Sequence, residues 1–368
     1  KMIKDVMEAL RFAWSPSSWD MFLWSIGLFS SYLKLLRASI FDSKSTPISS
    51  SIVPKIGSSR PICVVTGVTS GIGKATAFAL AEKGYHVVLG NALLPKVSPQ
   101  LLSETLKEIK SKNKDAQLKS FVVDMSCFSS IFNFKDSLEQ WLSDAELHPS
   151  VQLLVNNAGI MAISSRPTNE GYDRVMATNY IGPFTMTKLL LPLLENSSVP
   201  SRVVNVVSFT HRYASIGKVD KDYVTGKHFT TYNQYPHAHV YEYSKLCLLL
   251  FSYELHRQLR LKDDSHHVSV IAADPGFVKT NLMREYPKYV SAFAFLSFKL
   301  VGLLQTPDEG ARSSVDAALA PSETSGVYYF GGKGRTIKSS KASRDPKLGK
   351  QLWETSCGLF DQLQSYND

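Results

Sequence analysis

The amino-acid sequence predicts an α/β protein built on a doubly wound parallel β-sheet, with a hydrophobic helical extension at its N-terminal end. From residue 61 onward, short apolar runs alternate with longer segments of helical spacing. A glycine-rich turn joins the first run to the first such segment, and an aromatic stretch stands apart in front. Alternating strand and helix patterns are typical of a parallel sheet with helices on both faces.

The N-terminal extension occupies residues 1–42 and is rich in aromatic and aliphatic side chains. Within it, a helix over residues 19–41 would carry a broad apolar face and a narrow polar stripe that includes Lys34 and Arg37. This pattern predicts attachment to a membrane, either in the plane of the interface or across the bilayer. A cleaved targeting peptide and an arm packed on the same domain or on a partner are the alternatives.

A flexible linker is expected next, because residues 43–60 hold seven serines and two prolines. The remaining residues, 61–368, are expected to form one folded domain. Its expected buried strands are 62–66, 85–89, 119–123, 153–156, 202–207 and 268–272. The expected helices between them are 73–83, 103–112, 134–144, 175–195 and 241–260.

The composition narrows the classes of partner. Hydrophobic residues make up 44% of the 368-residue chain and charged residues 20%, as in ordinary globular proteins. The net charge is +9, but the basic residues are scattered, which disfavours a nucleic-acid surface and fits an anionic membrane or a phosphorylated cofactor better. The four cysteines lie far apart without a CxxC pair and the nine histidines are dispersed, which indicates neither a disulfide framework nor a metal site. Isolated thiols suit a reducing compartment.

A dinucleotide-binding turn is predicted directly after the first strand, where residues 66–73 read Thr-Gly-Val-Thr-Ser-Gly-Ile-Gly and a helix follows at once. Gly67 permits a tight turn, Gly71 lets the backbone approach a pyrophosphate, and Gly73 lets the helix pack close to the strand. The helix N-terminus then offers unpaired N–H groups to the phosphates. Strand, turn and helix together predict a Rossmann-like nucleotide site with the spacing G-x-x-x-G-x-G.

Three further motifs follow in order: Asn-Asn-Ala-Gly at 156–159, Tyr-x-x-x-Lys at 241–245 and Pro-Gly at 275–276. With the glycine turn they make the chain resemble the short-chain dehydrogenase/reductase family from about residue 61 to about residue 359. Tyr-Ser-Lys-Leu at 243–246 and Thr-Pro-Asp-Glu-Gly at 306–310 resemble its retinol-dehydrogenase-like branch. The aromatic leader with its serine linker is similar to a plant member of the family. The resemblance implies an NAD(P)-dependent oxidoreductase.

The proton chemistry is assigned to Tyr241 and Lys245, which are four residues apart and so share one face of a helix. Lowering a phenol pKa from about 10 to about 7 takes roughly 4 kcal/mol, and one cation at about 4 Å supplies about that much at an effective dielectric of about 20. An oxidised nicotinamide would add further positive charge. Tyr243 points to another side of the helix, and Tyr223 also precedes a lysine by four residues, but Gly226 interrupts any helix there.

The resemblance adds two more catalytic residues. Ser208 follows an apolar run, at the carboxyl end of a strand, where ligands bind in open α/β sheets. It would hold the substrate oxygen beside Tyr241, with a simple turn serine as the alternative. Asn179 matches the asparagine that completes a water-mediated proton relay in the family. The 33 residues from Ser208 to Tyr241 exceed the usual separation, which indicates an inserted loop near the site.

The nucleotide would be held by residues from every motif. By the resemblance, Asp124 contacts the adenine, and residues 275–280 face the nicotinamide carboxamide. The full expected set is Gly67, Ser70, Gly71, Ile72, Gly73, Asp124, Asn157, Ala158, Gly159, Tyr241, Lys245, Pro275, Gly276, Val278 and Thr280.

The preference between NAD and NADP is usually set at the end of the second strand. An acid there binds the ribose 2′-hydroxyl of NAD, whereas an arginine favours the 2′-phosphate of NADP. Residues 89–93 read Leu-Gly-Asn-Ala-Leu and offer neither. With no carboxylate to repel a phosphate, and with Lys74 and Lys96 close in sequence, NADP (NADPH) is favoured over NAD.

These expectations combine into hydride transfer between NADP(H) and a lipophilic alcohol, aldehyde or ketone. The apolar stretch 289–304 follows the cofactor segment, and this region covers the substrate in the family; a core or membrane-contacting helix is the alternative. We therefore expect a membrane-associated protein whose catalytic domain lies in an aqueous reducing compartment. The competing hypothesis is a membrane-bound regulatory or assembly subunit that keeps the nucleotide fold without metabolic turnover.

Overall fold

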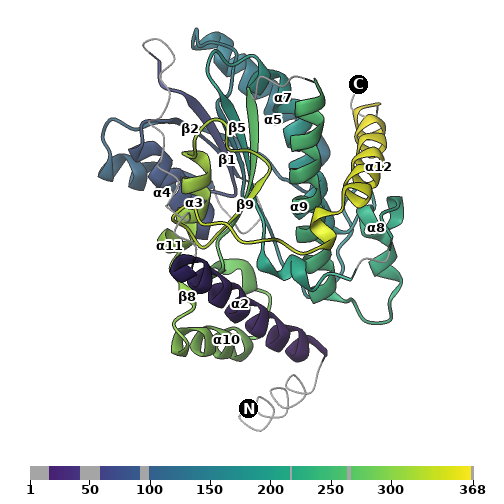
Figure 1. Ribbon diagram of the computed structural model, residues 1–368. Coiled ribbons are helices and arrows are strands. Elements are labelled where there is room, and N and C mark those ends of the chain that lie inside the picture. The colour runs from purple at the N-terminus through teal and green to yellow at the C-terminus, as the bar shows by residue number, and fades with distance from the viewer. Residues whose placement is uncertain (1–15, 42–58, 92–98, 216–217, 263–266, 366–368) are drawn as a thin grey trace.

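The computed structural model describes residues 16–41, 59–91, 99–215, 218–262 and 267–365. Within these ranges, seven strands form one parallel sheet in the order β3-β2-β1-β4-β5-β6-β9 (Figure 1). The strands are β1 (Ile62–Thr66), β2 (His86–Asn91), β3 (Gln117–Val122), β4 (Leu153–Asn156), β5 (Ser201–Val206), β6 (Val268–Asp274) and β9 (Val327–Phe330). The predicted doubly wound sheet is confirmed, and each of the six predicted strands is present to within two residues at either end.

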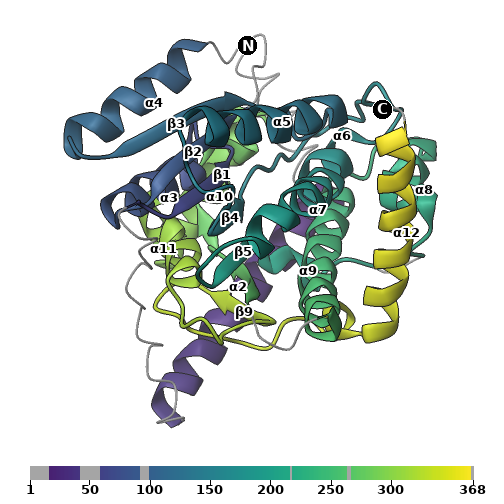
Figure 2. The same ribbon diagram turned by 90° about the horizontal axis from the view of Figure 1, so that it is seen from above.

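Helices cover both faces of the sheet, and each face has its own apolar core (Figure 2). On one face lie α3 (Gly71–Glu82), α4 (Pro99–Lys112) and α11 (Pro307–Ala318). The larger core, on the other face, is formed with α5 (Phe128–Asp144), α7 (Gly182–Glu195), α9 (His237–Lys262) and α12 (Pro346–Ser365). Because the central strands are buried on both sides, they read as continuous apolar runs in the sequence.

The strand order reverses at β1, which pairs with β2 on one side and with β4 on the other. The connections that leave β1 and β4 therefore go to opposite sides, and ligands of open α/β sheets bind at the carboxyl ends of such strands. The predicted glycine turn follows β1 and the Asn-Asn-Ala-Gly motif follows β4, so the fold brings both motifs to this edge of the sheet.

The expected single helix over 175–195 is wrong in part, because a π-helical turn interrupts it at Ala177–Ile181. The turn precedes Gly182, where an added Cβ would lie 2.2 Å from the carbonyl oxygen of Met125. The remaining short elements are α6 (Arg174–Met176), η1 (Ala177–Ile181), η2 (Phe209–Arg212), α8 (Lys221–Thr225), η3 (Lys227–Thr231), β7 (Phe277–Val278), η4 (Asn281–Met283), α10 (Lys288–Leu300), β8 (Leu304–Gln305) and η5 (Ala342–Arg344).

The N-terminal extension is described from residue 16, as helix α2 (Pro16–Phe41). Its inner face packs on the folded domain, where Trp24, Leu28 and Leu35 join the larger core. The inner face of α2 therefore corresponds to the alternative in which the extension is an arm packed on the same domain. The other face exposes Trp19, Phe22, Leu23, Ile26, Phe29, Leu33 and Leu36.

No helix in the described part of the chain has the length and apolar character needed to cross a membrane. Residues 1–15, and the expected linker 43–60 apart from its last two residues, lie outside the described residues.

Candidate active site

The glycine turn has the geometry of an anion site. Gly67 and Gly71 have φ angles of 71° and 56°, a left-handed backbone that glycine adopts without steric cost. A Cβ at Gly73 would lie 2.2 Å from the carbonyl oxygen of Gly67, so glycine is needed for α3 to begin this close to the turn. The Ser70 side chain does not cap α3. The backbone N–H groups of the first turn of this helix, including that of Ile72, are therefore left for an anionic ligand. These residues fit a dinucleotide pyrophosphate.

The segment after β4 closes on the same turn. Asn157 Nδ2 donates to the carbonyl oxygen of Thr66 at 2.8 Å, and Ala158 N donates to Thr66 Oγ1 at 3.0 Å. A Cβ at Gly67 would lie 2.9 Å from Ala158 Cα. The two strand ends are therefore tied together through backbone and small side chains, as close packing around a nucleotide requires.

Asp124 lies at the same edge of the sheet, just after β3. Its Oδ1 accepts from Ser126 N at 2.8 Å and from Ser126 Oγ at 2.7 Å. Its Oδ2 lies 3.7 Å from a guanidinium nitrogen of Arg174. The carboxylate thus stabilises its own turn, and its expected contact with adenine stays a prediction.

Tyr241 and Lys245 lie one turn apart on α9 and are almost fully buried, with 6% and 4% of their surfaces exposed. Lys245 Nζ donates to the carbonyl oxygen of Val206 at 3.0 Å and lies 5.9 Å from the centre of the Tyr241 ring. Ser208, just beyond the end of β5, is hydrogen-bonded to the Tyr241 side chain. The fold therefore brings Tyr241, Lys245 and Ser208 together at the carboxyl end of β5.

Burial controls the protonation of this pair. Desolvation raises the pKa of Tyr241 above its usual value, and the hydrogen bond with Ser208 opposes that rise. Desolvation lowers the pKa of Lys245 to about 8, and the charge of Asp274 opposes that fall. The expected lowering of the phenol pKa by Lys245 together with an oxidised nicotinamide stays a prediction, and without the cofactor burial dominates. The Lys245 ammonium is directed at the Val206 carbonyl, and desolvation of the phenol is the larger effect.

Asn179 lies fully buried in the π turn and links two parts of the site. Its Nδ2 donates to Ile160 O at 2.9 Å and to Ser244 Oγ at 3.0 Å, and its Oδ1 accepts from Ile160 N at 2.8 Å. A Cβ at Gly159 would lie 3.5 Å from both Asn179 Oδ1 and Lys245 Nζ. The structure therefore places Asn179 beside Lys245 and the end of the Asn-Asn-Ala-Gly motif.

Residues 275–280 face the glycine turn. Thr280 lies opposite Gly71, because a Cβ at Gly71 would meet the Thr280 side chain at 3.0 Å. Gly276 has a φ angle of 76°, and Val278 packs against Gly310 of α11. The segments that carry the four motifs thus lie together at one edge of the sheet.

Asp274, which the sequence analysis did not single out, is buried at the end of β6. Its Oδ1 accepts from Gly276 N at 2.8 Å, and its Oδ2 accepts from the Tyr328 hydroxyl. Burial raises the pKa of this carboxyl to about 6, and the hydrogen bond from Tyr328, together with the charges of Arg212 and Lys245, opposes that rise. An acid that ends an apolar run directly before Pro-Gly was the available signal.

Helix α2 also reaches the reacting pair, which the sequence analysis missed. Trp24 Nε1 donates to the buried carboxylate of Glu242, the residue after Tyr241. The Trp24 ring lies 6.3 Å from the Tyr241 ring, measured between centres. The alternative of an arm packed on the same domain named no contact residue, and the structure shows that α2 is part of the wall around the tyrosine.

The two competing tyrosines lie elsewhere. The Tyr243 hydroxyl donates to Lys218 O at 2.8 Å. Tyr223 belongs to the short helix α8, which ends at Gly226 in a left-handed conformation, and its ring stacks on His228 at 4.0 Å. Both arrangements agree with the reasons for preferring Tyr241. The segment between Ser208 and Tyr241 folds into η2, α8 and η3.

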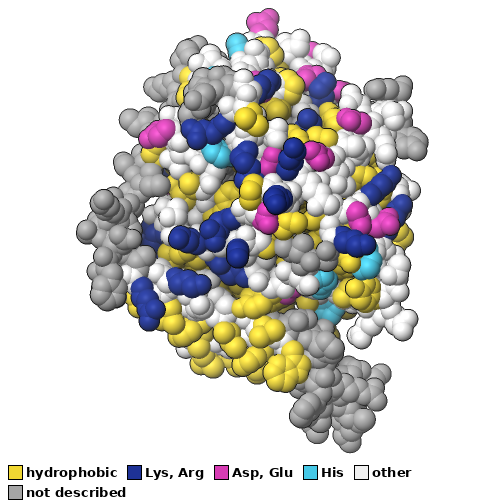
Figure 3. Space-filling model, turned by 45° about the vertical axis from the view of Figure 1, so that its right-hand side comes forward, with side chains coloured by type: hydrophobic (Ala, Val, Ile, Leu, Met, Phe, Trp, Pro, Cys, Tyr) yellow, Lys and Arg dark blue, Asp and Glu magenta, His cyan; other side chains and the backbone are white. Residues whose placement is uncertain are grey.

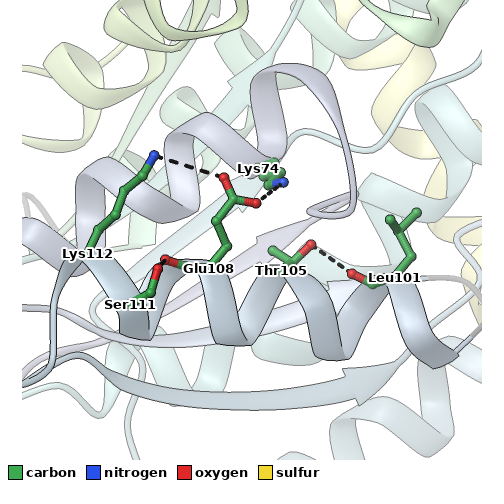
Figure 4. A network of polar contacts seen from close by, with 6 residues as sticks. All are labelled: Lys74, Leu101, Thr105, Glu108, Ser111 and Lys112. Atoms are coloured by element: carbon green, nitrogen blue, oxygen red, sulfur yellow. Dashed lines mark hydrogen bonds and ion pairs between the residues drawn. The ribbon is translucent and has the colours of Figure 1, made fainter.

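The end of β2 and its surroundings bear on cofactor preference. Asn91 ends the strand, and its Oδ1 accepts from Thr69 Oγ1 of the glycine turn at 3.0 Å. Lys74 is not free, because its ammonium pairs with Glu108 of α4, which also lies 3.9 Å from Lys112 Nζ (Figure 4). Lys96 lies outside the described residues. The charge expected from Lys74 for a 2′-phosphate is thus partly neutralised.

The chain matches known proteins in both sequence and structure. Residues 61–232 match the family model for short chain dehydrogenase. Polyprenol dehydrogenase of Homo sapiens is 35% identical over 309 residues, which cover 82% of this chain and 86% of that protein. Retinol dehydrogenase 12 of Homo sapiens is 32% identical over 301 residues, which cover 81% and 86%. These relatives confirm the expected family and the resemblance to its retinol-dehydrogenase-like branch.

A plant relative and two solved structures complete the comparison. The dehydrogenase/reductase SDR family member FEY of Arabidopsis thaliana is 33% identical over 262 residues, covering 70% of this chain and 64% of that protein, and it fits the expected likeness to a plant member of the family. A crystal structure of a protein from Mycobacterium paratuberculosis has a TM-score of 0.62 at 24% identity and covers 86% of this chain and 97% of that one. The angucycline C-6 ketoreductase LanV with bound NADP has a TM-score of 0.57 at 22% identity and covers 74% and 95%. The two structures share the fold.

Proposed function

The chain belongs to the short-chain dehydrogenase/reductase family, and we propose that it transfers a hydride between NADP(H) and a lipophilic alcohol or carbonyl compound. As a family member it is an NAD(P)-dependent oxidoreductase. The observation that carries the finer proposal is the buried Tyr241–Lys245 pair beside Ser208. This pair lies at the sheet edge where the glycine turn leaves amide groups for a nucleotide.

The proton steps fall to this chain's own residues. When bound, the nicotinamide supplies a hydride to a carbonyl carbon or accepts one from an alcohol. During reduction, the Tyr241 phenol gives its proton to the carbonyl oxygen; during oxidation, the phenolate takes the proton of the alcohol. Ser208, already hydrogen-bonded to Tyr241, would hold the same substrate oxygen. The Lys245 ammonium, on the same helix face, stabilises the phenolate and would hold the nicotinamide ribose.

Asn179 would complete a water-mediated proton relay. Its side-chain hydrogen bonds to Ile160 and Ser244 support this assignment, because they fix the π turn beside Lys245. Those bonds use both amide donors and the amide oxygen. The side chain would therefore serve the relay by holding the π turn in position, and not by binding the water itself.

The nucleotide would be held by the glycine turn with Ser70 and Ile72, by residues 157–159, by residues 275–280 with Val278 and Thr280, and by Asp124 at the adenine end. Preference for NADP is supported by Asn91, since no carboxylate stands at the end of β2 to repel a 2′-phosphate. The Lys74–Glu108 pair limits how much charge Lys74 adds.

A lipophilic substrate and a membrane surface are part of the proposal. The relatives named polyprenol dehydrogenase and retinol dehydrogenase 12 support a lipophilic class. We divide the chain into a membrane-associated helical segment at 1–42, a linker at 43–60 and a catalytic domain at 61–368. The apolar outer face of α2 supports attachment through residues 19–41. Four free thiols are compatible with a catalytic domain in an aqueous reducing compartment.

Consumption of NADPH with a panel of long-chain aldehydes and ketones tests the proposal. Turnover that grows with chain length and is lost in Ser208→Ala would support it. The competing hypothesis of a regulatory subunit requires NADPH binding without turnover of any of these compounds. That hypothesis is not favoured, because the four residues proposed as catalytic are present and lie close to one another.

A further inference from the structure

Exposed apolar side chains gather on two helices of the protein. Of the fifteen large hydrophobic side chains exposed in the described ranges, eleven lie on α2, on α10 or on the residue after α10. These eleven, called here the α2–α10 surface, are Trp19, Phe22, Leu23, Ile26, Phe29, Leu33, Leu36, Phe293, Leu296, Leu300 and Val301. The other four, Val122, Ile163, Tyr232 and Leu261, lie elsewhere on the protein. Clustering of this kind marks an interaction site on a soluble domain, whereas scattered residues do not.

The two helices pack on one short segment, so their outer faces lie together. Tyr32 of α2 accepts a hydrogen bond from Gln305 Nε2 at 2.7 Å. Phe298 of α10 packs on Phe277 with ring centres 3.9 Å apart. Phe277 and Gln305 belong to the paired strands β7 and β8. α2 and α10 lie near each other at the foot of the molecule in Figure 1, and Figure 3 shows apolar side chains gathered at that foot.

The charges on these helices are mainly basic, with Asp20 of α2 as the exception. Residues 21–41 and 288–301 contain no Asp or Glu, but they carry Lys34, Arg37, Lys288 and Lys299, all exposed. Apolar side chains bordered by cations match an anionic bilayer, because the apolar side chains can contact the acyl chains and the cations can contact the headgroups. A second copy docked by the same surface would set these cations against each other, because a twofold contact pairs identical patches.

The inner side of α2 borders the reacting residues. Trp24 donates to Glu242 and its ring faces Tyr241 at 6.3 Å between centres. A bilayer against the outer side of α2 would therefore be separated from the tyrosine by the thickness of one helix. A lipophilic compound leaving that bilayer would have a short path to the site.

We infer that the α2–α10 surface docks the protein on an anionic phospholipid bilayer, and that α10 is needed for this as much as α2. The inference deepens the proposed function and rests on it only for the lipid-held substrate, since docking requires no turnover. One side of α10 is buried in the protein through Val290, Ala294 and Phe298. The inference assigns its opposite side to the lipid.

Flotation of the full chain with NADPH on vesicles tests the inference. Vesicles of phosphatidylcholine with one-fifth phosphatidylserine should carry the protein. Phe293→Asn/Leu296→Asn should weaken this binding by about tenfold or more, because the two apolar side chains that would insert among the acyl chains are replaced by polar ones. The matched control Tyr232→Asn/Leu261→Asn removes an aromatic and a leucine that are 51% and 81% exposed elsewhere, and should bind as the unmodified protein does. Lys288→Gln/Lys299→Gln should weaken binding to anionic vesicles but not to pure phosphatidylcholine.

Equal NADPH affinity in all variants establishes that they are folded. The inference is overturned if the unmodified chain does not float, if the α10 variant binds as well as its control, or if the control weakens equally. It is also overturned if the α10 variant instead breaks a dimer seen by sedimentation while vesicle binding is unchanged. Absence of carbonyl turnover with normal docking would refute the proposed function and leave the docking surface standing.

Discussion

Replacing Asp274 by asparagine should lower turnover near neutral pH without lowering stability. Asp274 is fully buried and accepts from Gly276 N and from the Tyr328 hydroxyl. With a pKa raised to about 6, it is charged at neutral pH and attracts the Lys245 ammonium. Asparagine keeps the shape, and its carbonyl and amide can serve Gly276 N and the Tyr328 oxygen, respectively.

The size of the effect follows from the pKa of Lys245. With a pKa of about 8, Lys245 is about three-quarters protonated at about pH 7.5. Losing the nearby negative charge should lower this pKa by about one unit, or about 1.4 kcal/mol, and the protonated fraction then falls to about one-quarter. Because the ammonium is the form that stabilises the phenolate, kcat/KM should fall about threefold at about pH 7.5 and hardly at all at about pH 6.

The stability of the same variant should change in the opposite sense. Burial makes the folded state hold the Asp274 proton more tightly than the unfolded state, with a pKa of about 6 against an ordinary value of 3.8. The contribution of this group to stability therefore falls as pH rises from about 4 to about 6, by roughly 3 kcal/mol at most. Asparagine does not titrate, so the Tm of the variant near neutral pH should equal or exceed that of the unmodified protein.

The assay is kcat/KM measured as a function of pH, together with thermal unfolding at neutral pH. The alkaline limb of the profile should move from about pH 8 to about pH 7 in the variant. An equal loss of activity at every pH, or a lower Tm, would refute the reasoning, because either result would show that the carboxylate acts through packing and not through its charge.

Three further substitutions test other parts of the site. Ala92→Asp should shift preference toward NADH by about tenfold or more, because a carboxylate there repels the 2′-phosphate; tighter NADH binding by the unmodified protein would contradict the NADP proposal. Glu108→Gln should tighten NADPH but not NADH by at most about fivefold, since it frees the lysine paired with it. Trp24→Phe should lower the free energy of unfolding by about 1–3 kcal/mol, because the buried Glu242 loses its donor. The matched change Trp19→Phe, at a ring that is 61% exposed, should leave the Tm unchanged.

The sheet could be predicted because its central strands are buried on both faces and therefore read as unbroken apolar runs. The strand β9 (Val327–Phe330) was missed, although its aromatic and β-branched residues favour a strand. It becomes a strand by pairing with β6, which is distant in sequence. The π turn at Ala177–Ile181 was also missed, since it precedes the contact of Gly182 with Met125, which no local pattern encodes.

The site could be predicted where its residues lie within one motif, as Tyr241 and Lys245 do. Contacts between segments that are distant in the sequence could not be predicted. Trp24 and Glu242 are 218 residues apart, and Asp274 and Tyr328 are 54 apart. A helical wheel shows that α2 has two faces, but not that one of them packs beside the reacting tyrosine.

The assignment of the proton chemistry to Tyr241 is tested most directly by comparing Tyr241→Phe with Tyr223→Phe. NADPH consumption with a long-chain carbonyl and NADPH affinity are measured for both variants and the unmodified protein. Tyr241→Phe should lose turnover by about a hundredfold or more, while its Kd for NADPH stays within about twofold, because the phenol acts on the substrate and not on the nucleotide. Tyr223→Phe, at a ring stacked on His228, should keep full activity. Loss of turnover in Tyr223→Phe with an active Tyr241→Phe would contradict the assignment.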